Sequence, residues 1–165
     1  MHGFNDDEIC NFVELTHEKP VNIQFIEFMP FDGNVWNVKK LVLYSEMLDI
    51  VVKQFTGLKR LQDHPTDTAK NFCIGGHQGT VSFIKSMTEH FCAGCNRLRL
   101  LAGGNFKVCL FGPSEVSLRD PLCLSAEDHE LREIIGAELK RKKASHAGMF
   151  DIAKTANRPM IHIGG

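Results

Sequence analysis

The sequence predicts an α/β fold whose earlier and later parts are built differently. Residues 21–29, VNIQFIEFM, are rich in β-branched and aromatic residues, and the later half of this run is apolar on both faces. That pattern is typical of a buried parallel strand. Apolar residues at helical spacing flank the run on both sides, whereas the apolar runs beyond residue 58 are short and bounded by glycines. We therefore expect α/β layers first and small antiparallel hairpins afterwards.

Two helices are expected in the earlier part. Asn5 and Glu8 form a capping pair before the first helix, which Pro20 ends. Ser45 opens the second helix, and Gly57 ends it.

Two hairpins are expected in the later part. The first pairs residues 72–74 with 81–84, and the second pairs 98–101 with 106–110 around the turn 103–105. Beyond them, a serine at position 125 caps a last amphipathic helix. The sequence contains no internal repeat, so it indicates either a single compact unit or a piece of a larger one.

Composition narrows the classes of function. The chain has 165 residues, 43% hydrophobic and 24% charged, and a formal net charge of −1. This charge argues against a nucleic-acid-binding domain, and an anionic ligand would have to meet a local basic cluster. The longest apolar runs are too short for a membrane span, and the polar residues 5–8 argue against a signal peptide. Six cysteines in this setting indicate reduced thiols with a metal rather than a disulfide scaffold.

Three cysteines form the most informative motif. Cys92, Cys95 and Cys109 are spaced C-x2-C-x13-C, so that one turn and one hairpin could bring their thiols together. Three protein ligands leave one coordination position open for water or substrate. His90 could instead complete a Cys3His zinc site. Spacing alone leaves a zinc site and an iron-sulfur site equally open.

The second hairpin predicts what surrounds these thiols. Alternation along a strand places Cys95, Arg97 and Arg99 on one side, with Leu98 and Leu100 on the other. Two guanidinium groups would then lie beside the cysteines. Arginines here would by default form a solvated strand edge, but their place next to Cys95 favours binding of a phosphate or carbonyl oxygen.

The length of the turn decides where the third thiol lies. A three-residue turn over residues 103–105 would put Cys109 opposite Arg99, on the same side as the other thiols. A turn of two or four residues would put it on the wrong face.

Other candidates are weaker. Met29 ends the first strand, where a core role and a ligand-binding role are equally open. The basic run 140–143 is interpreted as a solvated helix end. Gly164 and Gly165 are interpreted as a frayed terminus. The remaining thiols are expected to be core or incidental: Cys10, Cys73 and Cys123.

Several stretches together resemble a known family. GFNDDEI, FIEFMP, FCAGCNRLRL, KVCLFG and the closing IGG are similar to the C-terminal half of the radical SAM GTP 3′,8-cyclases of molybdenum cofactor biosynthesis. The resemblance implies that Cys92, Cys95 and Cys109 bind a [4Fe-4S] cluster whose fourth iron is approached by the guanine of GTP. Zinc then becomes the minor interpretation.

The resemblance also implies roles for other residues. The GTP-contacting segment falls on Arg97, Leu98 and Arg99, with both arginines in the active site. The SAM-contacting methionine falls on Met29. The double glycine that reaches into the active site falls on the last two residues, Gly164 and Gly165.

The fold implied by the resemblance is the later part of an incomplete (β/α) barrel followed by an iron-sulfur-binding region. We expect the partial barrel over residues 1–60 and the C-terminal cluster- and GTP-binding region over 61–165. The family's N-terminal C-x3-C-x2-C motif for the SAM cluster does not occur in this sequence. We therefore expect a fragment of a lyase-class enzyme that cannot cleave SAM alone.

The resemblance carries further expectations about setting and partners. MPFDGNVWNVKK and HAGMF are closer to the eukaryotic branch, which implies the mitochondrial matrix, with the cytoplasm as the alternative if the source is bacterial. GTP is the expected substrate. A cyclic pyranopterin monophosphate synthase is expected to take the product onward, and the full-length family implies a homodimer without nucleic acid or membrane partners.

Overall fold

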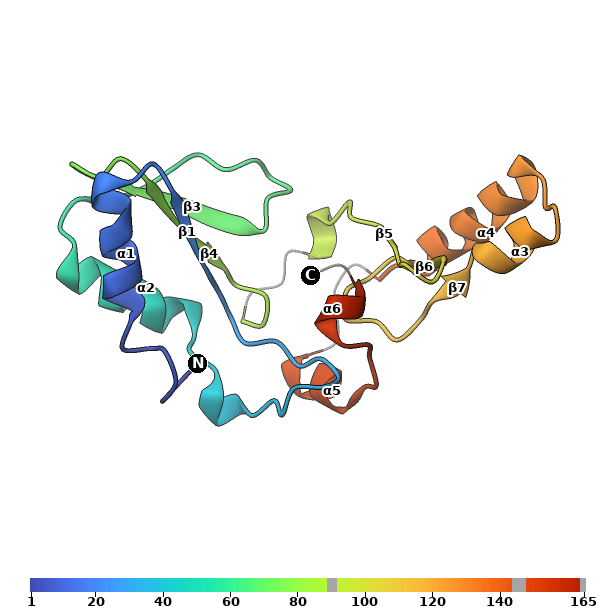
Figure 1. The fold of residues 1–165 in the computed structure, drawn as a ribbon, viewed down its shortest axis with the longest axis horizontal. Helices are drawn as coiled ribbons and strands as arrows, with labels where there is room; N and C mark the ends of the chain where they lie inside the picture. The colour runs from blue at the N-terminus through green and yellow to red at the C-terminus, as the bar shows by residue number, and fades with distance from the viewer. Residues whose placement is uncertain (89–91, 144–147, 164–165) are drawn as a thin grey trace. The chain divides into compact units, whose positions relative to one another are not determined.

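The computed structural model describes residues 1–88, 92–143 and 148–163, and the chain forms two compact units (Figure 1). Unit 1 comprises residues 1–29 and 36–94, and unit 2 comprises residues 30–35 and 95–165. This division differs from the one expected at residue 60, because strands beyond that point join the sheet of unit 1. As a division by function, the expected boundary stays a prediction.

Unit 1 is an α/β unit with a four-stranded sheet. Its elements are α1 (Ile9–Glu18), β1 (Asn22–Ile26), the 3-10 turn η1 (Val38–Lys40), α2 (Tyr44–Gln54), β2 (Leu58–Arg60), β3 (Ala69–Ile74), β4 (Thr80–Ile84) and the 3-10 turn η2 (Cys92–Gly94). The strand order is β1-β4-β3-β2, with β1 parallel to β4 and the other neighbours antiparallel. The expected α/β character and the first hairpin are confirmed.

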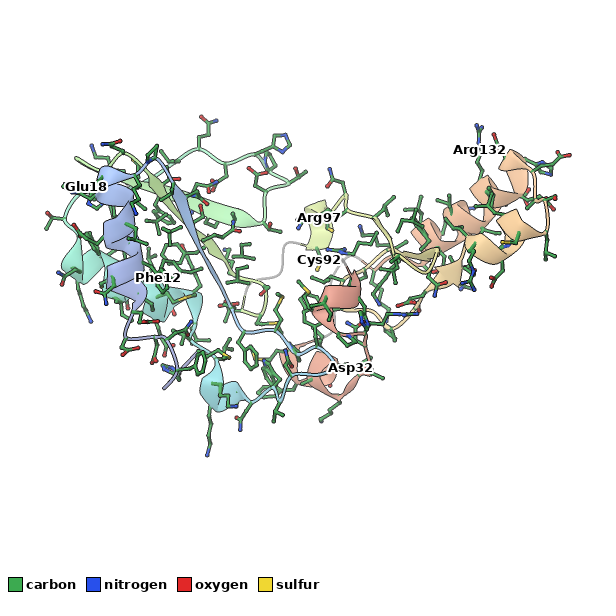
Figure 2. All side chains as sticks on the ribbon, viewed as in Figure 1. Phe12, Glu18, Asp32, Cys92, Arg97 and Arg132 are labelled. Carbon is green, nitrogen blue, oxygen red and sulfur yellow. The ribbon has the colours of Figure 1, made fainter. Side chains whose placement is uncertain are left out.

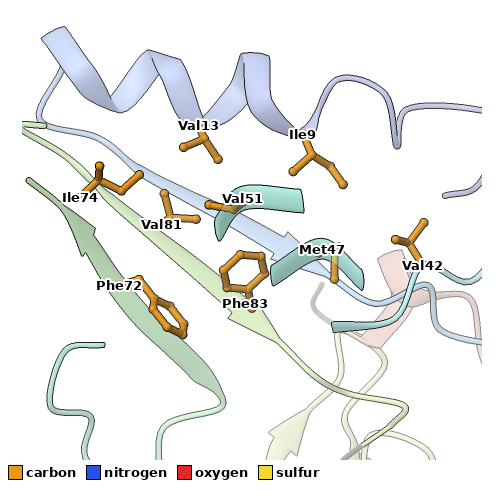
Figure 3. Close-up of a cluster of buried hydrophobic side chains, with 9 residues drawn as sticks. All are labelled: Ile9, Val13, Val42, Met47, Val51, Phe72, Ile74, Val81 and Phe83. Carbon is orange, nitrogen blue, oxygen red and sulfur yellow. The ribbon is translucent and has the colours of Figure 1, made fainter. Parts of the chain in front are cut away.

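The core of unit 1 lies between one face of this sheet and the two helices (Figure 3). Val81 and Phe83 alternate onto this face from β4 and are fully buried. Val13 of α1 and Val51 of α2 are buried against them. Burial of side chains this large stabilises the unit by about 1.5–3 kcal/mol each. The helical spacing of apolar residues seen in the sequence is therefore the spacing that covers this face.

The opposite face of the sheet is polar. Asn22 Nδ2 donates to Ser82 Oγ, which in turn donates to Asn71 Oδ1 on β3. Residues of β1 therefore alternate between exposed side chains on this face and half-buried side chains on the core face. Ile26, on the exposed face, is 49% exposed. The expectation that residues 21–29 form a strand buried on both faces is wrong, although the strand is parallel as expected.

Glu27 joins three segments of unit 1 just beyond β1. Its side chain is 1% exposed, and its two carboxylate oxygens accept four hydrogen bonds. The donors are the backbone N–H groups of Tyr44, Met87 and Thr88 and the Thr88 hydroxyl, at 2.6–3.0 Å. A buried carboxylate is tolerable only when its acceptors are paired in this way. Glu27 therefore fixes the start of α2 against the segment that follows β4.

Replacing Glu27 by glutamine should destabilise unit 1. One of its oxygens would become an NH2 group facing two donors, which we expect to cost about 3 kcal/mol. Urea unfolding followed by circular dichroism measures the loss. Glu18→Gln, at an exposed position labelled in Figure 2, is the matched control and should change the free energy of unfolding by less than about 0.5 kcal/mol. Equal stability of the two variants would contradict the role of Glu27.

Helix starts differ from those expected. The N-cap of α1 is Glu8, and Asn5 Oδ1 instead accepts a hydrogen bond from the amino terminus at 2.5 Å. The N-cap of α2 is Leu43, whose N–H donates to Glu46, so Ser45 lies inside the first turn. Neither expected residue caps its helix, and the N-cap Glu8 makes no side-chain hydrogen bond to α1. Both helices nevertheless occur where their apolar spacing predicted them.

Unit 2 is built from short elements. They are β5 (Arg99–Leu100), β6 (Asn105–Lys107), β7 (Val116–Ser117), α3 (Arg119–Cys123), α4 (Asp128–Arg141), α5 (Met149–Lys154) and α6 (Met160–Ile163). The strands form one antiparallel sheet in the order β5-β6-β7. The expected last helix is α4, but Glu127 is its N-cap, and Ser125 has a φ of +61° and lies before it. In the described residues, no helix is long and apolar enough to cross a membrane.

The turn between β5 and β6 is held against α3. Gly104 has a φ of +79°, and a Cβ added there would lie 2.5 Å from the Cβ of Arg119. The carbonyl of Gly104 also accepts the N–H groups of Leu118 and Arg119 at 2.9 and 3.2 Å. Only glycine combines this backbone conformation with so close an approach.

Gly104→Ala should therefore disrupt the β5–β6 hairpin. A left-handed alanine and a clash that cannot rotate away should together cost about 2 kcal/mol or more of unfolding free energy. Gly103→Ala is the control, because a Cβ there meets nothing within 4 Å and its φ is not positive. Thermal or urea unfolding of both variants measures the difference. If Gly104→Ala were no less stable than Gly103→Ala, the described turn would be wrong.

Candidate functional site

The β5–β6 hairpin pairs Arg99 with Lys107, not with Cys109. The turn has three residues, as expected, but comprises 102–104, since Leu101 N–H donates to the Asn105 carbonyl at 2.8 Å. The expected turn lay one residue later, so the pairing of Cys109 with Arg99 is wrong. A shift of the turn by one residue moves the pairing by two and leaves the facing of each side chain unchanged. Lys107 therefore occupies the place opposite Arg99, and Cys109 follows two residues later.

The two sides of the segment before the turn differ as predicted. Leu98 and Leu100 are 45% and 69% exposed, whereas Arg97 and Arg99 are half-buried. Figure 2 labels Arg97, on the segment that leads into β5. Leucines facing solvent and arginines facing the protein are the reverse of ordinary burial preference. The inward arginines must therefore have acidic or polar neighbours.

Thiols supply those neighbours for Arg99. Burial and the charge of Arg97 lower the pKa of Arg99, while Cys95 and Cys109 in their charged forms raise it. One guanidinium is thus within electrostatic reach of both sulfurs. The placement of Arg99 directly beside these cysteines stays a prediction.

Cys95 lies in an environment that favours its thiolate. Burial alone would raise the pKa of this thiol, but the backbone N–H of Arg97 and the charges of Lys142 and Arg97 hold the pKa below its usual value. The thiolate is the form that binds metals. A Cβ on Gly112 would lie 3.4 Å from the Cβ of Cys109 and 4.0 Å from its sulfur, which is ordinary van der Waals contact. The environment of Cys95 therefore suits a metal ligand.

The remaining candidates lie in unit 1 or outside the described residues. Cys92 begins η2 and Met29 ends the first segment of unit 1, and both are half-buried there. His90, Gly164 and Gly165 lie outside the described residues. Within the ranges 1–88, 92–143 and 148–163, no three His, Cys, Asp or Glu side chains are gathered closely enough to hold a metal. The three-cysteine centre stays a prediction.

Lys107 anchors the hairpin to the later part of unit 2. Its side chain is 1% exposed, and its ammonium donates to the Gly112 carbonyl and to Asn157 Oδ1, the latter at 3.1 Å. Glu115 Oε1 lies 3.8 Å away. Burial lowers the pKa of Lys107, and the nearby Glu115 and Cys109 charges oppose that shift. A lysine this buried needs every one of these partners.

Asn157 and Arg158 complete this anchor. Asn157, 7% exposed, donates from its side chain to the Leu110 carbonyl at 3.0 Å and from its backbone to Asp32 at 3.2 Å. Arg158 Nε donates to both carboxylate oxygens of Glu115 at 2.8 and 2.9 Å. We call Lys107, Glu115, Asn157 and Arg158 the anchor network. It fixes the segment that leads into α6 against β6.

Comparison with known proteins identifies the family of this chain. Residues 21–148 match the family model described as Molybdenum Cofactor Synthesis C. The chain belongs to this family. The C-x2-C-x13-C motif and the β5–β6 hairpin both lie inside the matched residues.

Relatives in this family resemble the chain along its whole length. GTP 3′,8-cyclase, mitochondrial, from Arabidopsis thaliana is 79% identical over 165 residues, which is 100% of this chain and 42% of the relative. Molybdenum cofactor biosynthesis protein 1 from Mus musculus is 58% identical over 99% of this chain and 26% of the relative. GTP 3′,8-cyclase from Desulforamulus reducens is 40% identical over 100% of this chain and 51% of the relative. The chain thus spans a quarter to a half of the length of these Molybdenum Cofactor Synthesis C relatives.

The sequence did not predict the anchor network or the contact of Lys142 with the Cys95 segment. A signal for Lys107 was present, because a lysine interrupts the apolar run FKVCLF. Its partner Asn157 is 50 residues away and has no local signal. The basic run 140–143 was expected to be solvated throughout, but Lys142 is half-buried and its ammonium donates to Cys95.

The anchor network should make stability depend on pH. Burial raises the pKa of Glu115, but hydrogen bonds from Arg158 and Asn105 outweigh it and hold the pKa below its usual value of 4.5. A folded pKa below the unfolded pKa gives stability that is present above the unfolded pKa and lost as pH falls through the folded pKa. Glu115→Gln should therefore lower the free energy of unfolding at neutral pH and flatten its fall between about pH 5 and pH 3.

Urea unfolding at a series of pH values measures this effect. Glu133→Gln, at an exposed position on α4, is the control and should leave the profile of the unaltered chain in place. An acid-side slope that is the same in Glu115→Gln and the unaltered chain would show that Glu115 has an ordinary pKa.

Proposed function

We propose that this chain is the C-terminal, cluster- and GTP-binding part of a lyase-class radical SAM GTP 3′,8-cyclase, which converts GTP to 3′,8-cyclo-7,8-dihydro-GTP in molybdenum cofactor synthesis. The family match and the 79% identity to the Arabidopsis protein support this assignment. The structural observation that carries it is that the charges of Cys95 and Cys109 both raise the pKa of the half-buried Arg99. An anion-binding group beside metal-binding sulfurs is what such a site needs.

Cys92, Cys95 and Cys109 are the proposed ligands of a [4Fe-4S] cluster. When bound, the cluster would supply an iron with an open coordination position for the guanine base, and SAM would supply the radical chemistry. The lowered pKa of Cys95 supports thiolate ligation at that position. The cysteines' task is to hold the site in a fixed orientation to the bound nucleotide.

Arg97, Leu98 and Arg99 are the proposed GTP-contacting residues. GTP is strongly anionic, and a chain with a net charge of −1 must meet it with a local excess of cations. Arg97 and Arg99 raise the positive charge at the thiols, and Lys107 lies opposite Arg99. The forked guanidinium donors suit phosphate oxygens and would stabilise charge that develops on the nucleotide.

Gly164 and Gly165 are proposed to reach the reacting nucleotide. The anchor network supports this role, because it fixes Asn157 and Arg158 a few residues upstream of the double glycine. Because Asn157 and Arg158 are already fixed, the residues that follow them would lose less conformational entropy on entering the nucleotide site.

Unit 1 is proposed to be the later part of an incomplete (β/α) barrel. The parallel pairing of β1 with β4 and the helices α1 and α2 on one face support this assignment. Within the described residues, β1 has a strand neighbour on one side only, so a further strand could pair with its free edge. Met29, just beyond this strand, is the proposed SAM contact, since barrels bind ligands at the carboxyl ends of their strands.

The setting and partners of the proposed enzyme follow from the family. The Arabidopsis relative is named as mitochondrial, which supports a mitochondrial location and, by proposal, the matrix. A homodimer of the complete enzyme is also proposed, as is a cyclic pyranopterin monophosphate synthase that consumes the product. The 165-residue chain has no C-x3-C-x2-C motif and is proposed to be inactive toward SAM without the rest of the enzyme.

Anaerobic reconstitution of the chain with iron and sulfide tests the proposal. The preparation should hold about four iron atoms per chain, show cluster absorption and release no 5′-deoxyadenosine from SAM. Cys109→Ala should lose the absorption, while Cys123→Ala, at an exposed cysteine, should keep it. Arg97→Ala should keep the cluster and weaken GTP binding about tenfold or more, because a charge-assisted contact is lost.

Arg132→Ala is the control for Arg97, since Arg132 is an exposed arginine on α4 (Figure 2). It should leave GTP affinity unchanged. A colourless protein that holds one zinc would favour the Cys3His alternative with His90 and overturn the cluster assignment. Unchanged GTP affinity in Arg97→Ala would overturn the nucleotide role of that arginine alone.

A further inference from the structure

Lys142 differs from the other cations of its run. Lys140, Arg141 and Lys143 are exposed, and Arg141 pairs with Glu138 at 2.8 Å. Lys142 is half-buried and directs its ammonium to the cysteine segment. It follows the last residue of α4, where its backbone N–H donates to the Leu139 carbonyl at 3.1 Å.

The ammonium of Lys142 meets three acceptors. It lies 2.6 Å from the Cys95 carbonyl oxygen, 3.2 Å from the Arg97 carbonyl oxygen and 3.6 Å from the Cys95 sulfur. An ammonium group has three N–H donors and no acceptor, so the number of acceptors matches the number of donors. The Lys142 side chain therefore contacts both ends of segment 95–97 and the sulfur of Cys95.

We propose that Lys142 is a positioning residue of the cysteine site, which sets the conformation of segment 95–97 and raises the reduction potential of the group bound to Cys95. The second part rests on the proposed function. The potential of an iron-sulfur cluster depends on the hydrogen bonds to its sulfurs and on nearby charge. A cation that donates to a ligand sulfur stabilises the form that has gained an electron.

The same contacts give Lys142 a second consequence. Cys95 and Arg97 are a proposed cluster ligand and a proposed GTP contact, and they are separated by one residue. Because Lys142 binds both carbonyls, it fixes the backbone of Arg97 relative to the Cys95 sulfur. Displacement of the lysine should loosen the two groups together.

Substitution of Lys142 by methionine tests both parts of the proposal. Met keeps most of the apolar length and removes the charge and the donors. In the reconstituted chain, Lys142→Met should shift the redox equilibrium of the cluster about tenfold toward the oxidised form, which corresponds to a potential about 59 mV lower for one electron. Spectroelectrochemical titration measures this shift. Lys143→Met, at the exposed neighbouring position, is the matched control and should leave the potential unchanged.

Hydrogen exchange of the chain without a cluster provides an independent measurement. Amides of residues 95–99 should exchange at least about tenfold faster in Lys142→Met than in Lys143→Met, because the carbonyl contacts of the segment are lost. Lys142→Arg, which keeps charge and donors, should recover part of both effects. Exchange elsewhere in the chain should match the unaltered protein, which shows that the variant folds.

The outcomes separate this proposal from the proposed function. If the unaltered chain holds no cluster, the proposed function fails, and hydrogen exchange alone decides the positioning role. If the cluster forms and Lys142→Met has the potential and the exchange rates of Lys143→Met, the proposal for Lys142 is wrong and the cluster assignment stands. An altered exchange rate with an unchanged potential would keep the positioning role and overturn the effect on the bound group.

Discussion

A buried ammonium group holds unit 2 in its described form. Lys107 is nearly inaccessible, and its charge is met by the Gly112 carbonyl and the Glu115 carboxylate from one loop and by the Asn157 side-chain oxygen from a distant segment. Removal of any one partner would leave a charge that low-dielectric surroundings penalise by several kcal/mol. Arg99 is placed opposite this lysine and Cys109 two residues beyond it, so the candidate site inherits its geometry from the same contact.

The candidate site concentrates positive charge within a chain that is close to neutral. Arg97, Arg99, Lys107 and Lys142 all act on the thiols of the site or on one another. Carboxylates neutralise the outer part of this group, since Glu115 pairs with Arg158 and approaches Lys107. Near the thiols, the charges of Cys95 and Cys109 act on Arg99. Such a division favours an anionic ligand at the cysteines without attracting nucleic acid to the whole surface.

The parts of the fold that could be predicted are those with local causes. Apolar spacing located α1, α2 and the β3–β4 hairpin, and strand alternation predicted that Arg97 and Arg99 are half-buried while Leu98 and Leu100 are exposed. The contacts that were not predicted join positions far apart in the sequence. Glu27 contacts Thr88 across 61 residues, and Lys142 contacts Cys95 across 47. The helix caps were also not predicted: Asn5 accepts from the amino terminus instead of capping α1, and the N-cap Glu8 makes no side-chain hydrogen bond. The turn was misplaced by one residue, because Gly103 and Gly104 occur in both the expected turn 103–105 and the observed turn 102–104. The close approach of Arg119 to Gly104 is a contact that the local sequence does not reveal.

The carboxylate of Glu27 also sets an order on the synthesis of the protein. Its donors run from Tyr44 to Thr88, and the last of them, 61 residues after Glu27, leaves the ribosome well after β1 has been made. Until then, burial of the carboxylate would leave two or more acceptors unpaired, so β1 has reason to stay hydrated. Unit 1 can therefore close only when the segment beyond β4 has emerged. The next residues to emerge are those that lead into the cysteine motif, so the sheet and helices of unit 1 are complete just before Cys95 and Cys109 leave the ribosome.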